Sequence, residues 1–496
     1  MFAQIKYLYT ADEVRRLDRL AIEKLNVSEF ELMQRAGQAA FAALQRRWPR
    51  ARNITVLCGK GNNAGDGYII AHQAHTNNLR VKIVYLCDID QLQGAAREAV
   101  ELCIQNNIPM QPFDPGIECK SDILVDALLG TGLRGEVDEE YRIAIECMNN
   151  SGLPILAVDL PSGLIADSGT VAGVAVKANL TVTFIGCKRG FFTGEGMNYC
   201  GEVLLAHLDI PNELLHSIEP QVDLLYLKPL KKLLPKRSRT AHKGYFGAVL
   251  VVGGDYGMPG SVRMAAEAAA RVGAGLVTVA TRPEHVAIVS GARPELMCYG
   301  VNNAQELKPL LARATMVVVG PGLGRGAWGK ELLTTVFQSD KPKLIDADGL
   351  NLLSGNNMPN GNWILTPHPG EAGRLLEMSS QDVQQDRYGA IQKIVDIYGG
   401  VCVLKGAGTL VCGGEWNRIG ACAAGNPGMA SGGMGDLLSG IIAGLVAQGI
   451  DLSSAARMGV LLHAKAADLA ALDGGERGLL ATDLMVHLRK LVNNEV

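Results

Sequence analysis

The sequence predicts an α/β protein with two domains, each built on a mostly parallel sheet. Short apolar, β-rich runs alternate with helical segments along both halves of the chain. Almost every such run ends in a glycine-rich or polar turn, and ligands of parallel sheets bind at such strand ends. A chain of 496 residues is also too long for one ordinary core. We therefore expect a doubly wound sheet in residues 1–220 and a second α/β domain in residues 221–496.

The first half opens with two helices and continues with alternating strands. Thr10 and Glu13 fit a capping box, which predicts a helix that starts after Thr10. A second helix runs through Leu32–Gly37 to Trp48, where Pro49 ends it. Five β-rich runs follow, most of them separated by helical spacers, and they predict parallel strands at 54–58, 81–86, 123–126, 155–159 and 180–184.

Three of these strand ends carry polar groups. The first runs into Gly59–Gly67, which differs from the G-x-G-x-x-G pattern because Asn62, Asn63 and Asp66 take part in the turn. The others lead into 130–136 and 158–163. An Asp at a strand end is often only a helix cap. Three such ends in one sheet nevertheless predict a common crevice.

Residues 228–243 join the two halves. This stretch holds seven Lys or Arg residues and two prolines and lacks apolar periodicity. It therefore indicates a solvated connector, and we place the boundary near 215–235. His242–Gly247 directly precedes a strand and could reach an anionic ligand.

The second half repeats the alternation of strands and polar turns. Strands are predicted at 248–252, 276–280, 316–319, 344–348, 363–366 and 401–404. The turns after four of them are Gly253–Ser261, Gly320–Gly324, Pro367–Glu371 and Lys405–Thr409. We leave open whether Asp346 and Asp348 cap a helix or serve magnesium indirectly.

A glycine-rich loop, Asn426–Asp436, precedes an apolar run at 437–446 that is typical of a buried helix. Free amide groups and the helix dipole make such a helix start an anion site. A carboxylate at this point is suited to take a proton from a hydroxyl that receives a phosphoryl group. The alternative for Asp436 is a plain helix N-cap.

Composition narrows the class of protein. The net charge is −3, without a long single-sign block, which argues against nucleic acid as the main partner. Residues 1–20 lack the apolar core of a signal peptide, and no apolar run reaches the length of a membrane span. The eleven cysteines show no paired spacing. We expect reduced thiols, a cytoplasmic location and no membrane partner.

The polar strand ends of the first half resemble the N-terminal domain of the bifunctional NAD(P)H-hydrate repair enzymes. The resemblance implies a Rossmann-like domain that epimerises the hydrated cofactor NAD(P)HX between its R and S forms, with Asp159 transferring the proton. It implies a potassium ion at Asn63, Asp126 and Ser162, whose oxygen ligands suit a hard cation. The implied substrate contacts are Asn62, Asn63, Ala64, Gly65, Asp66, Gly130, Thr131, Gly132, Leu133, Arg134, Gly135, Glu136, Tyr141 and Asp159.

The second half resembles the partner domain of the same family, a ribokinase-like ADP/ATP-dependent dehydratase. The resemblance rests on motifs at 242–244, 320–324, 366–371, 405–409 and 432–436. It implies substrate contacts from Ser261, Gly322, His368 and Asp436. It implies nucleotide contacts from Lys405, Gly406, Ala407, Gly408, Thr409 and Gly435, with magnesium at the transferred phosphate.

The mechanism that follows from the resemblance is dehydration driven by phosphorylation, with Asp436 as the base. The expected partners are NAD(P)HX and ADP or ATP, and the Ala- and Gly-rich helices lead us to expect a homo-oligomer. One rival is a small-molecule kinase of ribokinase-like fold with a fused accessory nucleotide-binding domain. Another makes the N-terminal half a nucleotide-sensing or oligomerising module without activity.

Overall fold

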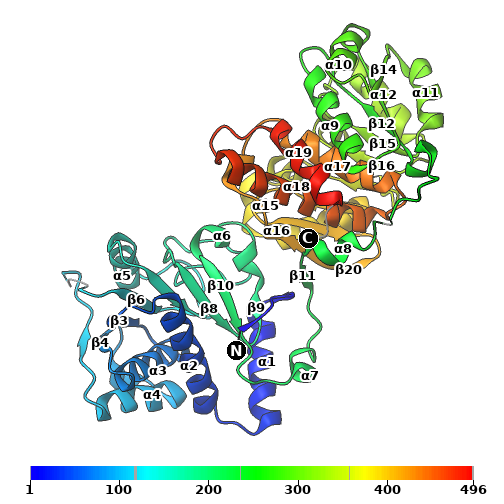
Figure 1. The fold of residues 1–496 in the computed structure, drawn as a ribbon. Helices are drawn as coiled ribbons and strands as arrows, with labels where there is room; N and C mark the ends of the chain where they lie inside the picture. The colour runs from blue at the N-terminus through cyan, green and yellow to red at the C-terminus, as the bar shows by residue number, and fades with distance from the viewer. Residues whose placement is uncertain (1, 117–119, 235, 357, 494–496) are drawn as a thin grey trace. The chain divides into compact units, whose positions relative to one another are not determined.

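The computed structural model describes residues 2–116, 120–234, 236–356 and 358–493 (Figure 1). The chain divides into two compact units, one ending at Asp223 and one beginning at Leu224. No helix in the described ranges is long and apolar enough to cross a membrane. Each unit is described by itself below.

The first unit contains a doubly wound, Rossmann-like sheet, as the sequence predicts. All neighbouring strands in it are parallel except β1. The strand order reverses between β3 and β6, so the carboxyl ends of β3, β6 and β7 meet at the switch point, where doubly wound sheets bind ligands. In sheet order the strands are β1 (Phe2–Ala3), β10 (Glu202–Ala206), β8 (Leu180–Phe184), β7 (Ile155–Val158), β6 (Ile123–Ala127), β3 (Asn53–Cys58), β4 (Arg80–Tyr85) and β5 (Met110–Pro112).

Helices cover both faces of this sheet. Val56 and Ile83 pack in one core with α2, α3 and α4, whereas Leu57 and Val84 pack in another with α5. In Figure 1, β3 and β6 accordingly lie between α5 and the pair α3 and α4. Alternate side chains along a strand point to opposite faces, which explains this division. The helices of the unit are α1 (Ala11–Leu25), α2 (Glu29–Arg47), α3 (Asn62–Thr76), α4 (Gly94–Gln105), α5 (Glu139–Asn150), α6 (Gly196–Tyr199) and α7 (Asn212–Leu215).

The N-terminal helix starts at the capping box that the sequence predicts. Thr10 accepts from the backbone N–H of Glu13, and Glu13 accepts from that of Thr10. Just before it, β2 (Tyr7–Tyr9) pairs with β9 (Cys187–Lys188) and with β11 (Val222–Leu224). The sequence analysis missed these short strands. Pairing of β2 with β9 brings Lys188 close to the start of α1.

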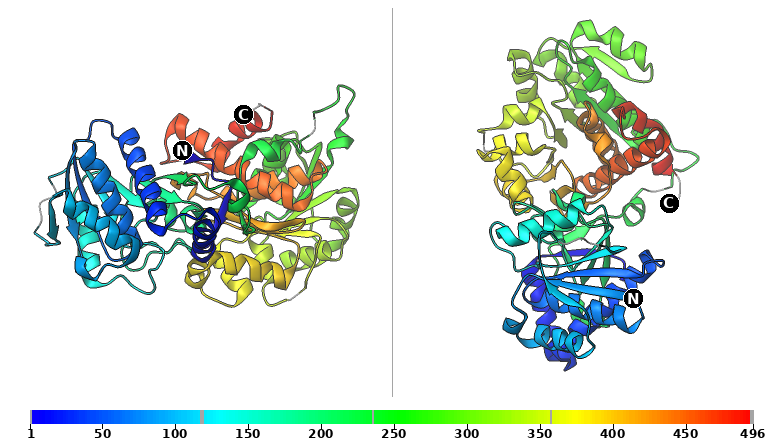
Figure 2. Two further views of the ribbon diagram at one scale, coloured as in Figure 1. Left: turned by 90° about the horizontal axis from the view of Figure 1, so that it is seen from below. Right: turned by 90° about the vertical axis from the view of Figure 1, so that its left-hand side faces the viewer.

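The second unit is also an α/β layer structure. Its strands from β14 to β18 are parallel, and two antiparallel strands extend the sheet. In Figure 2 (left) the orange and red helices α17–α19 lie on one face and the yellow helices α14–α16 on the other. In sheet order the strands are β14 (Met297–Gly300), β13 (Leu276–Thr281), β12 (Ala248–Val252), β15 (Met316–Val319), β16 (Lys343–Ile345), β17 (Trp363–Leu365), β18 (Val401–Leu404), β19 (Thr409–Gly413) and β20 (Trp416–Cys422).

One helix of the second unit begins inside the turn that was predicted at Gly253–Ser261. Pro259 starts a helix at its first position, which its fixed φ favours, so Ser261 lies in a helical turn and not in the preceding loop. The helices are α8 (Leu227–Lys231), α9 (Pro259–Val272), α10 (Val286–Ala292), α11 (Ala304–Arg313), α12 (Ala327–Phe337), α13 (Asp348–Leu353), α14 (Pro369–Leu376), α15 (Ser380–Gln385), α16 (Arg387–Tyr398), α17 (Met434–Ala447), α18 (Leu452–Gly474) and α19 (Leu484–Asn493).

Helices α9 and α17 pack against each other through glycine. A Cβ on Gly440 would strike the carbonyl oxygen of Ala265, and one on Gly444 would meet that of Ala269 at 2.7 Å. The second contact lies four residues further along both helices than the first. The helices therefore run parallel in one register, and the same register sets Asp436 against Ser261.

The basic stretch 228–243 begins as folded structure and not as a solvated connector. Its first part forms α8, and Leu227 and Leu230 on that helix are buried in the core of the second unit. The sequence analysis missed this helix because two leucines give too short an apolar pattern to identify.

Candidate active sites

A cavity of about 730 Å³ opens at the switch point of the first unit. Most residues that the sequence analysis singled out line it: Asn62, Asn63, Asp66, Gly130, Thr131, Gly132, Leu133, Arg134, Glu136, Tyr141 and Asp159. Ala64, Gly65 and Gly135 are not among the lining residues. Gly65 instead faces the side chain of Met33 on α2, where a Cβ would collide with the sulfur.

Asp159 follows β7 and is held in an unusual backbone conformation. Its φ is +62°, in the left-handed region that side chains rarely adopt. Its carboxylate forms an ion pair with the ammonium of Lys188 and accepts from the Thr183 hydroxyl at 3.1 Å. Lys188 is 1% exposed and also donates to Thr183 at 2.8 Å. Charge-assisted contacts of this kind fix the position of the carboxylate.

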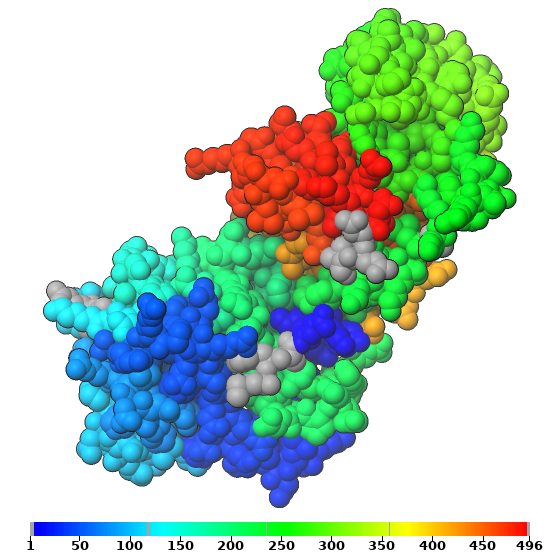
Figure 3. Space-filling view, viewed as in Figure 1, coloured from blue at the N-terminus to red at the C-terminus, as the bar shows by residue number. Residues whose placement is uncertain are grey.

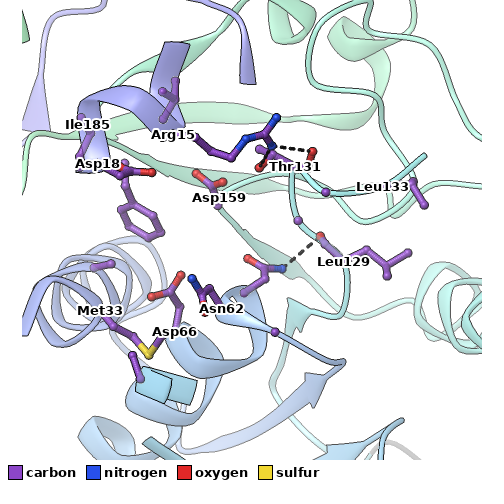
Figure 4. Close-up of a pocket in the computed structure, with 18 of the residues that line it drawn as sticks. Arg15, Asp18, Met33, Asn62, Asp66, Leu129, Thr131, Leu133, Asp159 and Ile185 are labelled. Carbon is purple, nitrogen blue, oxygen red and sulfur yellow. Dashed lines mark hydrogen bonds between the residues drawn. The ribbon is translucent and has the colours of Figure 1, made fainter. Parts of the chain in front are cut away.

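Two further carboxyl groups, those of Asp18 and Asp66, face the same space as Asp159 (Figure 4). Burial raises the pKa of Asp18 to about 6, and the Asp159 charge adds to this. Burial, together with Asp159 and Asp18, raises the pKa of Asp66 well above its usual range. The cavity thus combines a lysine-paired carboxylate with two carboxyl groups whose pKa is raised by burial. Such a pair of environments supplies both a base and an acid.

The side chains expected to hold potassium meet beside this cavity. Asp126 and Ser162 are fully buried, and Ser162 donates its hydroxyl to Asp126 at 2.5 Å and its backbone N–H at 2.8 Å. The amide nitrogen of Asn63 donates to the Leu129 carbonyl at 3.1 Å. The amide oxygen of Asn63 is buried without a hydrogen-bond partner among the described residues. A buried orphan oxygen beside a carboxylate fits a hard cation.

The sequence analysis missed Asp18 and Lys188. Both come from outside the glycine-rich strand ends: Asp18 lies inside α1, and Lys188 lies on a two-residue strand. A charged residue on an amphipathic helix looks solvated in the sequence. Its position four residues after the buried Val14 was the available signal.

In the second unit, the glycine-rich loop feeds directly into α17, whose N-cap is Gly433 with φ +88°. No side chain caps this helix, so its first amide groups are open to an anion. Asp436 lies in the first helical turn and is not the N-cap, which removes the plain capping alternative. Burial raises its pKa to about 6 with help from the charge on Asp346, while a hydrogen bond from Ser261 and the charge on Lys405 act against this.

A chain of charged groups lies beneath this helix start. The ammonium of Lys405 contacts Asp346 at 2.7 Å and Glu371 at 3.7 Å, and Ser439 donates to Asp346 at 2.8 Å. Burial would raise the pKa of Asp346, but Lys405 and these hydrogen bonds outweigh it and lower the pKa. The Lys405 side chain is therefore committed inside the protein. A nucleotide contact from Lys405 therefore has to come from its backbone and not from its ammonium group.

His368 caps α14 and keeps one ring nitrogen for other contacts. Its Nδ1 accepts from the backbone N–H of Gly370 at 3.0 Å, so Nε2 carries the proton of the neutral ring. Burial and the neighbouring Lys405 and Arg374 lower its pKa, which favours that neutral form. Its side chain is half exposed, and its Nε2 lies 3.4 Å from a carboxylate oxygen of Glu371.

Residues 405–408 form the turn between the antiparallel strands β18 and β19. The guanidinium of Arg387, which is 1% exposed, donates to the carbonyls of Leu404, Lys405 and Gly408, each at 3.3 Å. These bonds orient the three carbonyl groups toward the buried guanidinium of Arg387. Gly435 lies close by, since a Cβ on it would be 3.3 Å from Lys405 Nζ.

The turn after β15 completes the site. Gly322 has φ +56°, and a Cβ there would meet Ser261 Cβ at 3.3 Å, so Gly322, Ser261 and Asp436 are neighbours. Asp348 accepts from the backbone N–H of Gly324 at 2.9 Å, which fixes this turn and identifies Asp348 as a turn-holding residue. No three His, Cys, Asp or Glu side chains gather as a metal cage anywhere in the described ranges.

Comparison with known proteins identifies the family of each half of the chain. Residues 249–490 match the NAD(P)H-hydrate dehydratase family, and residues 29–190 match the family of YjeF-related protein N-termini. The chain is 56% identical to the bifunctional NAD(P)H-hydrate repair enzyme of Coxiella burnetii over 98% of this chain and 99% of that protein. It is 42% identical to that of Escherichia coli, over 99% and 94%.

A solved ribokinase-like superfamily protein from Enterococcus faecalis is 28% identical, with a TM-score of 0.50, over 55% of this chain and 95% of that one. The second unit therefore has the ribokinase-like fold that the sequence predicts. With such identity over its full length, the chain belongs to the family of bifunctional NAD(P)H-hydrate repair enzymes.

Proposed function

We propose that this protein repairs hydrated nicotinamide cofactors with two activities. Residues 1–220 epimerise R- and S-NAD(P)HX, and residues 221–496 dehydrate S-NAD(P)HX to NAD(P)H with ADP or ATP, which leaves AMP or ADP and phosphate. Membership of the family supports both activities. The observation that carries the second is Asp436, placed in the first turn of an uncapped helix start and bonded to Ser261.

In the dehydratase site, Asp436 removes the proton from the hydroxyl group of the hydrated ring. That oxygen forms a bond to the terminal phosphorus of the nucleotide, and the bond from phosphorus to the bridging oxygen breaks. The open amide groups at the start of α17 stabilise the charge on the transferred phosphoryl group. Phosphate then leaves the ring carbon with the electrons of the C–O bond, and the neighbouring ring carbon loses a proton, which restores the double bond of NAD(P)H. Phosphate departs far more readily than hydroxide, which is why a nucleotide is needed.

Ser261, Gly322 and His368 would position the substrate for this step. Lys405–Thr409 and Gly435 would hold the nucleotide through backbone amides, because the Lys405 ammonium is committed to Asp346. Magnesium, when bound, would neutralise the phosphate charge. Asp346 is occupied by Lys405 and Ser439, so this fits a magnesium ion that is carried mainly by the nucleotide.

In the epimerase site, Asp159 would exchange the proton at the hydroxylated centre of the substrate. Lys188 holds the Asp159 carboxylate in place, and Asp18 or Asp66 would carry the proton on the opposite side. The lining residues Asn62, Asn63, Asp66, Gly130–Arg134, Glu136 and Tyr141 would bind the substrate. Asn63, Asp126 and Ser162 would hold potassium, which supplies a fixed positive charge beside the cavity. The orphan amide oxygen of Asn63 supports this set.

The described cysteines are all free, as a reducing cytoplasm would keep them, and we place the protein there. We also propose a homo-oligomer. Neither assignment bears on the chemistry of the two sites.

One experiment tests the function against its rivals. The purified protein is mixed with both epimers of hydrated NADH, magnesium and ADP or ATP, and the absorbance of reduced nicotinamide is followed. Complete recovery is the expected result. Recovery of one epimer alone would contradict the epimerase, and a stable phosphorylated product without recovery would favour the small-molecule kinase.

A further inference from the structure

A second large cavity, of about 1230 Å³, lies in the second unit, away from the residues of the catalytic site. It is formed by α8 and the segment after it, the C-terminal ends of α9 and α17, and the last turns of α19. In Figure 3 these segments carry the green of residues 228–273 and the red of the chain's end. The catalytic Asp436 lies at the opposite, N-terminal end of α17.

The lining of this cavity is strongly basic. Seven of its described lining residues are Lys or Arg, and none is Asp or Glu: Lys228, Lys231, Lys232, Lys236, Arg237, Arg271 and Arg489. Like charges gathered in a concave surface repel each other and attract anions. The chain as a whole has net charge −3, so this concentration is local.

Two of the seven cationic side chains have partners within the protein. Arg237 donates to the carbonyl of Gly273 at 2.6 Å and to Gln448 at 2.9 Å, and its guanidinium lies 3.7 Å from the ring centroid of Phe246. Arg271 pairs with Glu267 at 3.4 Å. Arg237 thus meets the carbonyl end of a helix, as cations commonly do, and Arg271 is held by an ion pair.

The remaining five cations have no such explanation. Lys228, Lys232, Lys236 and Arg489 form no ion pair with any described residue. Lys231 differs from the other four, because its side-chain nitrogen is buried and has no hydrogen-bond partner within the described parts of the chain. A buried ammonium without a partner is strongly unfavourable unless an anion completes the site. Lys231 thus points to a ligand independently of the charge count.

We propose that this cavity binds a small polyphosphate anion through Lys231, Arg489, Lys228, Lys232 and Lys236. A phosphate chain offers several acceptor oxygens per charge, which matches several ammonium donors on one concave surface. The cavity is large enough for a small-molecule ligand. The ligand can be an inorganic polyphosphate or the phosphate chain of a nucleotide, and the site lies outside the catalytic residues in either case.

The test is a calorimetric titration of sodium tripolyphosphate into the full-length protein and two double variants. Lys231→Met with Arg489→Met removes two cations of the cavity, and Lys308→Met with Lys330→Met removes two exposed lysines from α11 and α12. Because the catalytic site also takes phosphate groups, the difference between the variants is the readout. Turnover of hydrated NADH and thermal unfolding report whether each variant is folded.

We expect the cavity variant to bind tripolyphosphate at least about tenfold more weakly than the wild type, since two charge-assisted contacts are lost. The control variant should bind like the wild type. A parallel titration with ATP identifies the source: a weakening of both ligands indicates recognition of the phosphate chain itself. Equal affinity in both variants, or binding of an RNA oligonucleotide without binding of tripolyphosphate, would overturn the proposal. These readouts are binding constants, so they stand apart from the proposed activities.

Discussion

Replacement of Ser261 by alanine should shift the pH dependence of the dehydratase without removing the reaction. Asp436 acts as a base only when ionised, and its pKa is raised to about 6. The hydroxyl of Ser261 donates to this carboxylate and so favours the ionised form. Loss of that bond therefore raises the pKa of Asp436 and moves the acid limb of activity toward higher pH.

The magnitude follows from the strength of one hydrogen bond to a charged group. At about 1.5 kcal/mol, it corresponds to a shift of about one pKa unit. Near pH 6.5 the ionised fraction of Asp436 then falls from about three-quarters to about one-quarter, a roughly threefold loss. Near pH 8 both proteins are about nine-tenths ionised or more, so this component of the difference disappears.

The assay is kcat/KM for NADH recovery from the S epimer at saturating nucleotide, measured across this pH range. Ser339→Ala, at the end of α12, is the matched control, because its hydroxyl donates only to the Val336 carbonyl there. Contact between Ser261 and substrate would lower the rate equally at every pH. A uniform loss with an unchanged midpoint would therefore refute the role of Asp436 as the titrating base.

Two further changes test the ion site and the nucleotide turn. Asn63→Leu removes the orphan amide oxygen. When potassium replaces choline in the buffer, the Tm of the wild type should rise and the Tm of the variant should not. Equal rises in both proteins would exclude Asn63 as a ligand. Arg387→Met frees the carbonyls of Leu404, Lys405 and Gly408. We expect a several-fold higher KM for ADP or ATP and a loss of roughly 3 kcal/mol in the free energy of unfolding, with epimerisation retained. An unchanged KM in a folded variant would show that nucleotide binding by the turn does not depend on Arg387.

The sequence predicted the two α/β folds well because strand patterns and glycine-rich turns are local signals. The positions of Asn63, Asp126 and Ser162 at one point followed from the rule that parallel strand ends share an edge. Asp18 and Lys188 were not predicted as site residues, because their approach to Asp159 depends on pairing between β2 and β9, which are distant in sequence. For Lys405 the sequence predicted the position but not the partner. Its ammonium group pairs with Asp346, because the buried carboxylate needs a compensating charge.

The pairing of Ser261 with Asp436 shows what packing adds to a motif. The two residues are far apart in the sequence, and neither motif contains information about the other. Their contact depends on Gly440 and Gly444, which let α17 approach α9 in a fixed register. The apolar run after Asp436 predicted a buried helix, but only the fold identifies the helix against which it packs.

The central claim is that two separate sites carry two separate activities, and reciprocal substitutions test it most directly. Asp436→Asn and Asp159→Asn are each assayed for exchange between the R and S epimers and for nucleotide-dependent recovery of NADH from the S epimer. We expect Asp436→Asn to abolish recovery and retain exchange, and Asp159→Asn to lower exchange about 10²-fold or more and retain recovery. Loss of both activities in either folded variant would contradict this account.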